Sequence, residues 1–392
     1  MDTKVSKLTF WNIWLSYALY YFGKVNLGIV VPVLLVMFSD LSLYNVGLVS
    51  SSFFAAYAIG QFLHGHISEK YNPFIYVSIG LIGSAIINFI LGWWGGLFFV
   101  LIIGEFMDGL FQSMGWSSCV RANALIQDKK NRERSSIILG TSYQIGNSVA
   151  WLVCATVVGW WGWRAGFFVA SLVLFLRGIT LLITRPEIDL SNMEKRTIAT
   201  QVKKTLIWPV ILGGIALCLL NMIRFGIITW IPLYLFQQGD LTVASMSSIG
   251  WKICLLPLAG VVGTLIYNKI NKDKELLTII FCGILSIVFV ALTFSTEWWA
   301  LLFLLIGSFL IYGPHVFLVS TLPARFVDNQ ITASSTGFID GMGYVGTILI
   351  GIIVPFLLSA SSYGWACVFL FWAILALLIS ILVAVIYKYQ KR

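Results

Sequence analysis

The chain has 392 residues, of which 59% are hydrophobic and only 10% are charged, and its mean hydropathy is +0.92. Soluble globular proteins carry about 25% charged residues, so this composition excludes that class. The net charge of +9 does not indicate nucleic-acid binding, because the basic residues gather at the ends of apolar segments, as they do in membrane proteins.

Apolar segments long enough to cross a bilayer as helices recur along the whole chain. In chain order, the twelve predicted spans are 8–37, 45–66, 74–93, 97–122, 136–160, 164–184, 208–236, 244–267, 276–294, 298–321, 334–358 and 363–387. The first span is too long to be the apolar core of a cleaved signal peptide. We therefore expect an all-α integral membrane protein with twelve transmembrane helices.

The polar segment 185–207 divides the spans into two sets of six. We expect an N-terminal six-helix bundle at 1–184, a cytoplasmic linker at 185–207 and a C-terminal six-helix bundle at 208–392. The two bundles would be pseudo-symmetric repeats related by an axis along the membrane normal. The sequence contains no G-x-x-x-x-G-K-[ST] loop, which argues against ATP as an energy source.

The positions of Lys and Arg predict the orientation in the membrane. Twenty of the 25 fall on one side of the predicted topology, at both termini, in the central linker and in the loops after spans 2, 4, 8 and 10. By the positive-inside rule both termini are cytoplasmic. No Asn-x-Ser/Thr sequon occurs, which fits a bacterial inner membrane. The six cysteines all lie within spans without a Cys-x-x-Cys pair, so we expect neither metal nor disulfide. No cofactor is expected.

Two cations lie deep within predicted spans at matching positions. Lys24 stands eight residues before Pro32, and Arg224 stands eight residues before Pro232. A charge at the bilayer centre costs about 2.5–3.5 kcal/mol on insertion scales. An anion held by both cations explains this cost most simply; the alternative is that each side chain snorkels to an interface.

Polar side chains share a helix face with Lys24. Tyr17 and Tyr21 precede it by seven and three residues, so the three lie on one side of span 1. Three other spans carry similar pairs near their middle: Tyr57 with Gln61, Tyr143 with Asn147, and Asp340 with Tyr344. We expect these side chains to line a substrate site at mid-membrane.

Three acids also lie in or near the membrane. Glu105 and Asp108 on span 4 carry protons, bind an ammonium group of the substrate, or neutralise a buried cation, Arg177 or Lys252; of these we favour the ion pair. For Asp340 we expect recognition of a hydroxyl or amine on the substrate. The three histidines are expected as polar rim residues at the cytoplasmic ends of spans: His64, His66 and His315.

Several motifs point to a known family. The turn Gly65–Pro73 resembles the loop that marks the major facilitator superfamily. Four further motifs are similar to those of the organophosphate:phosphate antiporters, which include bacterial glycerol-3-phosphate and hexose-phosphate transporters. They are Tyr71-Asn72-Pro73, Phe111–Trp116 with Cys119 and Arg121, Phe309–Pro314, and Gly337-Phe338 with Gly343-Tyr344-x-Gly346. The resemblance covers essentially the whole chain.

The resemblance implies roles for residues at matching positions. Two arginines hold the phosphate in that family, and Lys24 and Arg224 occupy their positions. The tyrosines that line the family's pocket match Tyr17, Tyr21, Tyr57 and Tyr344. A cytoplasmic gate would comprise Gly65, Glu69, Lys70 and Arg121.

The chain departs from the family pattern at three positions: lysine replaces the span 1 arginine, and the family's lysine near Gln61 and its histidine at Tyr143 are missing. The positive charge around the site is therefore lower, which makes a monoanion or zwitterion an alternative substrate.

The expected activity is exchange of a phosphate ester, such as a sugar phosphate or glycerol-phosphate-like compound, for inorganic phosphate by alternating access. The alternatives are a proton-coupled symporter of a non-phosphorylated anion or zwitterion, and a non-transporting sugar-phosphate sensor. No enzyme activity is expected, because the sequence shows no arrangement of a nucleophile with a base. The expected partners are the small anion and the lipid bilayer, with no nucleic acid, and the protein is expected to be a monomer.

Overall fold

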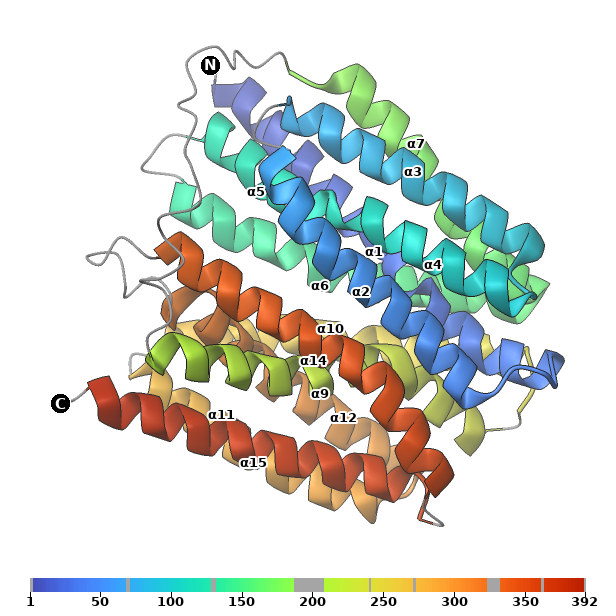
Figure 1. The fold of residues 1–392 in the computed structure, drawn as a ribbon, viewed down its shortest axis with the longest axis vertical. Helices are drawn as coiled ribbons and strands as arrows, with labels where there is room; N and C mark the ends of the chain where they lie inside the picture. Colours follow the sequence, from blue (N-terminus) through green and yellow to red (C-terminus); the bar gives the residue numbers. More distant parts are fainter. Residues whose placement is uncertain are drawn as a thin grey trace. The chain divides into compact units, whose positions relative to one another are not determined.

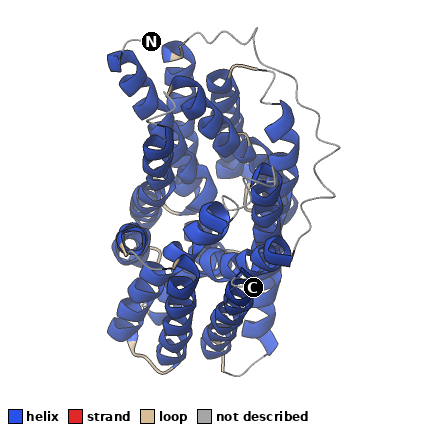
Figure 2. Cartoon of the chain, turned by 90° about the vertical axis from the view of Figure 1, so that its left-hand side faces the viewer, coloured by secondary structure: helices blue, strands red, loops and turns tan. Residues whose placement is uncertain are grey.

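The computed structural model describes residues 3–67, 71–127, 132–186, 208–239, 241–270, 273–322, 332–360 and 363–390. Over these residues all regular secondary structure is helical (Figure 2). The helices, labelled in Figure 1, are α1 Thr3–Met37, α2 Leu43–Ile67, α3 Pro73–Trp94, α4 Phe98–Ser113, α5 Gly115–Ile126, α6 Arg132–Trp161, α7 Trp163–Thr184, α9 Trp208–Gln238, α10 Ser245–Lys269, α11 Lys274–Thr293, α12 Glu297–Val316, η2 Phe317–Thr321, α14 Thr332–Ala360 and α15 Trp365–Gln390.

The expected all-α membrane architecture is confirmed. In the described parts of the chain, eleven helical segments are long and apolar enough to cross a membrane, and each matches one predicted span. The remaining span, predicted at 136–160, is helical within α6 but is not among the eleven. The reason is its polar content, since α6 carries Gln144 and Asn147 together with several hydroxyl residues.

The helices depart locally from the predicted spans. Span 4 divides into α4 and α5 at Met114. Span 10 passes from α12 into a π-helix, η2, three residues after Pro314. Gly65, the first residue of the predicted Gly65–Pro73 turn, lies near the end of α2, as the predicted span 45–66 implies.

The chain forms two compact units. Unit 1 comprises Met1–Met193 and Ile231–Cys254, and unit 2 comprises Glu194–Trp230 and Leu255–Arg392. The end of α9 and the start of α10 thus group with unit 1. Most of the predicted linker lies outside the described residues, so the division into two six-helix bundles stays a prediction.

In unit 1, α1 is the central packing element and lies against α6 and α7, while α3 lies alongside α7 and α4 (Figure 1). The contact of α1 with α6 is close at Gly146. A Cβ atom there would lie 2.2 Å from the Ala18 carbonyl oxygen, so only glycine fits. This approach brings the polar face of α6 against the tyrosine face of α1.

In unit 2, α11 packs against α15 and α12 (Figure 1). Here α14 approaches α9 as α6 approaches α1: a Cβ atom on Gly346 would lie 2.0 Å from the Cys218 carbonyl oxygen. Ala18 precedes Lys24 by six residues, and Cys218 precedes Arg224 by six. Each unit therefore contains the same glycine contact, six residues before the cation within its helix.

We expect Gly146→Val to destabilise the protein by about 1–3 kcal/mol, because the new side chain meets backbone that cannot yield. Thermal unfolding of the purified protein in detergent measures the effect. Gly140→Ala, on the same helix with open space around its Cβ, is the matched control and should leave the unfolding temperature unchanged or higher. Equal effects of both substitutions would contradict the close contact.

Candidate functional site

The ammonium of Lys24 is held by aromatic rings. Its Nζ lies 3.9 Å from the ring centroid of Tyr57 on α2 and 5.5 Å from that of Tyr21 on its own helix. Tyr57 is almost completely buried and Lys24 is half-buried. Faces of aromatic rings attract a cation electrostatically, more strongly where water is excluded. These contacts keep a positive charge within an apolar helix.

Further aromatic side chains extend this cluster across unit 1. The rings of Tyr21 and Tyr143 stack with centroids 6.3 Å apart, which joins α1 to α6. Tyr17 packs edge-on against Tyr21 at 6.1 Å and lies 4.7 Å from Trp116 of α5. The sequence thus correctly placed Tyr17, Tyr21 and Lys24 on one face. Trp116, which belongs to the motif Phe111–Trp116, is not among the site residues that the sequence predicts.

Two amide side chains near the cluster carry unsatisfied polar atoms. Gln61 lies one turn beyond Tyr57, and its Nε2 is buried without a hydrogen-bond partner among the described residues. Asn147 lies one turn beyond Tyr143, and its Oδ1 is likewise buried without a hydrogen-bond partner in the described part of the chain. Most buried polar groups in proteins are hydrogen-bonded, so such exceptions call for an explanation. A polar ligand would supply one here.

In unit 2, Arg224 on α9 contacts a histidine. Its Nη1 lies 3.2 Å from Nε2 of His315, and its Cζ lies 5.3 Å from the ring centroid of Tyr312. A guanidinium can only donate hydrogen bonds, so His315 Nε2 must accept. The imidazole is therefore neutral in this contact, with its proton on Nδ1. Arg224 thus keeps its full positive charge while its position is fixed.

The structure corrects the expected place of His315. The sequence assigned it to a cytoplasmic rim, yet its side chain touches Arg224. Tyr312 was also missed, although both residues belong to or adjoin the motif Phe309–Pro314. The signal was available: Tyr312 and His315 are three residues apart on one face of an otherwise apolar span.

The polar residues of span 11 lie on α14. Tyr344 is linked to the Arg224 region through Phe225, whose ring centroid is 6.5 Å from that of Tyr344. Asp340 is half-buried one turn before Tyr344. Their shared face therefore stays consistent with the expected site, while the part that each plays in binding remains a prediction.

The predicted cytoplasmic gate is described only in part. Arg121 donates from Nη1 to the Tyr71 carbonyl oxygen at 3.0 Å, which ties α5 to the turn before α3. Glu69 and Lys70, the charged members of the predicted network, lie outside the described residues.

Arg177 does not neutralise the span 4 acids. Its Nε donates to Ser16 Oγ at 2.9 Å, and its Nη2 donates to the Asn12 carbonyl oxygen at 2.6 Å. These bonds join α7 to α1. Among the described residues, no ion pair joins Glu105 or Asp108 to a cation.

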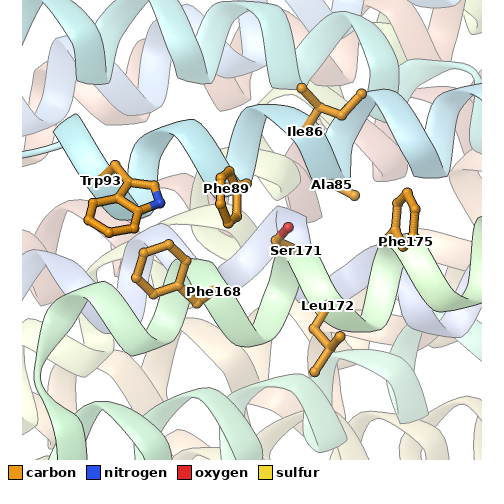
Figure 3. Close-up of a pocket in the computed structure, with 8 residues that line it drawn as sticks. All are labelled: Ala85, Ile86, Phe89, Trp93, Phe168, Ser171, Leu172 and Phe175. Carbon is orange, nitrogen blue, oxygen red and sulfur yellow. The ribbon is translucent and has the colours of Figure 1, made fainter.

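A separate apolar groove of about 590 Å³ runs between α3 and α7 in unit 1. Figure 3 shows Trp93 and Phe168 at one end and Phe175 at the other, with Ser171 as the single polar residue of the lining. Phe89, Trp93 and Leu172 are exposed there. The groove presents no charge and contains none of the predicted site residues, so it does not suit a small anion.

Comparison with known proteins places these features in a family. The sequence profile described as Major Facilitator Superfamily matches residues 13–351. The chain is 26% identical over 373 residues to the "Membrane sensor protein UhpC" of Escherichia coli (strain K12), covering 87% of this chain and 83% of that protein. It is 23% identical to the "Glycerol-3-phosphate transporter" of Bacillus subtilis (strain 168), covering 94% and 93%. The resemblance inferred from the motifs is confirmed.

The fold has a similar solved counterpart. A bacterial homolog of the human lysosomal transporter Spinster, in an inward-facing and occupied conformation, matches with a TM-score of 0.77 and covers 100% of this chain and 98% of that chain. Its sequence identity is 13%, so the likeness concerns the fold alone.

We expect His315→Leu to destabilise the protein by about 1–3 kcal/mol, because it removes the acceptor for a buried guanidinium donor. His315→Gln keeps a carbonyl acceptor and should recover most of the loss. Thermal unfolding of both variants tests this contact, and identical losses would show that the acceptor is unimportant.

Proposed function

The chain belongs to the Major Facilitator Superfamily, and we propose that it exchanges a small phosphate ester for inorganic phosphate by alternating access. The anion would take one cation from each half of the chain, Lys24 from the first and Arg224 from the second. The relatives named above support the substrate class, since one is a glycerol-3-phosphate transporter. A sugar phosphate or a glycerol-phosphate-like ester fits best.

One observation carries this proposal: each unit holds a cation at the same place in its repeat, among aromatic side chains that bear hydroxyl groups. A cation kept in an apolar helix is costly and usually marks a functional site. Duplicating that cost in both halves is explained if both cations bind one ligand. Tyrosine hydroxyls add hydrogen bonds without adding charge.

The two cations would contribute differently to the phosphate. Arg224 offers a planar fork of donors that suits two phosphate oxygens at once. Lys24 acts as a point charge, so it attracts the anion but fixes its orientation less. The neutral His315 adds no charge, which limits the site to two positive groups from these residues. Such a site suits a small monoester.

The rest of the substrate would be recognised by uncharged groups and one acid. Gln61 and Asn147 each carry a buried polar atom that lacks a hydrogen-bond partner among the described residues. Hydroxyl groups of a sugar or of glycerol could satisfy them. Asp340 would accept a hydrogen bond from a hydroxyl, or bind an amine, at the end of the substrate away from the phosphate.

Transport follows if the bound anion favours the conformation in which both halves contact it. A ligand shifts a conformational equilibrium only by its difference in affinity for the two states. An anion that needs both Lys24 and Arg224 has that difference. The exchange would take place in a bacterial inner membrane, with both termini in the cytoplasm and the protein acting as a monomer.

A second candidate function is sensing, because one relative is named a membrane sensor protein. A sensor would use the same anion site without turnover. Phosphate-loaded liposomes separate the two functions: labelled inorganic phosphate should exchange across the membrane if the protein is a transporter, and should bind without exchange if it is a sensor.

We expect Lys24→Ala and Arg224→Ala each to weaken inorganic phosphate binding by about 10–100-fold, since hydrogen bonds to a charged group contribute about 1.5–3 kcal/mol. Half-saturation of phosphate exchange in liposomes, together with ligand-induced thermal stabilisation, measures the loss. Arg164→Ala removes an exposed arginine outside the site and serves as the matched control. Wild-type affinity in both alanine variants would refute the proposed anion site.

We expect Asp340→Asn to change the rank order of substrates while phosphate itself still binds, because the carboxylate would contact the end of the substrate that bears hydroxyls. Competition of glycerol 3-phosphate and hexose phosphates against labelled phosphate measures the order. An unchanged order would remove Asp340 from substrate recognition.

A further inference from the structure

Two carboxyl groups lie one turn apart in the interior of unit 1. Glu105 and Asp108 both belong to α4, and their exposed fractions are 2% and 0%. Residues three apart on a helix lie on the same face, so the two groups are neighbours. Oε1 of Glu105 is buried and has no hydrogen-bond partner among the described residues.

In Asp108, by contrast, each carboxyl oxygen accepts a hydrogen bond. Ser84 Oγ donates to its Oδ1, and Asn88 Nδ2 donates to its Oδ2 at 3.0 Å. Both donors come from α3. A carboxylate that accepts hydrogen bonds at both oxygens is stabilised in its ionised form. The two acids therefore sit in opposite environments: Asp108 is solvated by amide and hydroxyl groups, and Glu105 is left unsolvated.

Two cations within the membrane spans of unit 1, Lys24 and Arg177, have other contacts. Lys24 lies over the Tyr21 and Tyr57 rings, and Arg177 is bonded to Asn12 and Ser16. On the helices packed against α4, namely α1, α2, α3 and α5, the other titratable groups whose side chains the structure describes are Tyr17, Tyr20, Tyr44, Tyr57, His64, Tyr76, Cys119 and Arg121. Two buried carboxylates with no paired cation cannot both be ionised, because burial and mutual repulsion both oppose the second charge.

We propose that Glu105 and Asp108 form a proton-binding site, which holds one proton shared by the pair and exchanges it as the anion binds. The proton enters from water, joins a carboxylate oxygen to give a neutral carboxylic acid, and leaves as that acid ionises again. The site would couple anion movement to a proton, which goes beyond phosphate exchange alone.

A hydrogen-bonded route links the pair to the helix that carries Lys24. Asn88, which binds Asp108, also accepts from Asn26 Nδ2 on α1 at 2.6 Å. Gln112 donates to Ser84 Oγ at 2.9 Å and to the Tyr20 carbonyl oxygen at 3.2 Å.

The packing of α1 against this route is tight. A Cβ atom on Gly23, next to Lys24, would lie 2.6 Å from Gln112 Nε2 and 2.9 Å from Ser84 Oγ. A shift of α1 on anion binding would therefore move the donors that hold Asp108 and change the proton affinity of the pair.

Infrared difference spectroscopy of the purified full chain tests the proton site without any substrate. At neutral pH the wild type should show the C=O band of a protonated carboxylic acid, shifted in D2O, and Glu105→Gln should lose it. Asp40→Asn, a change to an exposed acid, is the control and should keep the band. Asp108→Asn provides a second measurement, because removing the neighbouring carboxyl group should shift the frequency of the C=O band. Spectra of the wild type and of Glu105→Gln that are identical in this region would overturn the proposal.

Liposomes test the coupling, which rests on the proposed function. An inward proton gradient should accelerate uptake of labelled inorganic phosphate by the wild type, and the ratio of gradient-driven uptake to exchange should fall toward one in Glu105→Gln. The wild type and Glu105→Gln are compared at the same pH, so the ionisation state of phosphate is the same for both. The control Asp40→Asn should keep the wild-type ratio. Equal ratios in all three proteins would overturn coupling. Absence of any phosphate transport would instead reject the proposed function, while the infrared result still decides the proton site.

Discussion

Holding a positive charge inside an apolar membrane helix costs free energy, and this constraint shapes both halves of the chain. Lys24 and Arg224 both bear this cost, and the surroundings of each reduce it in a different way. The Lys24 ammonium lies over the faces of two tyrosine rings. The Arg224 guanidinium donates to a neutral imidazole and lies beside another tyrosine ring. In both cases the charge is stabilised and kept, so it stays able to attract an anion.

On α4 the same free-energy cost applies to negative charges. Glu105 and Asp108 are buried without a paired cation among the residues that the structure describes, and the polar side chains of α3 supply donors to only one of them. A membrane interior tolerates such a pair by leaving one member protonated. Hydrogen bonds of amide side chains on α1, α3 and α4 join this pair to the helix that carries Lys24. If the proposed anion and proton sites are correct, this connection would be the physical basis for coupling a proton to an anion.

Close packing at glycine sets the position of these groups. Gly146 and Gly346 allow helices to approach to backbone contact, and Gly23 allows α1 to lie directly on the polar network. Membrane helices often pack through such small residues. The hydrophobic effect does not drive helices together within lipid, so close van der Waals contact must stabilise the association. The π-helical turn after Pro314 belongs to the same helical segment as Tyr312 and His315. Irregular helix geometry of this kind is frequent at functional sites.

The sequence by itself determined the class of the protein, the helical spans and the two cations within them. Hydropathy over some 20 residues reports bilayer crossing directly, and a charge inside such a segment is visible without a structure. Helical periodicity also placed Tyr17, Tyr21 and Lys24 on one face. Only the tertiary structure decided which helices meet. It brought His315 to Arg224, sent Arg177 to α1 instead of α4, and gave Asp108 donors that Glu105 lacks. The physical reason is that contacts between distant segments depend on close approach at particular glycines and on side-chain direction, neither of which the spacing of residues along one helix contains.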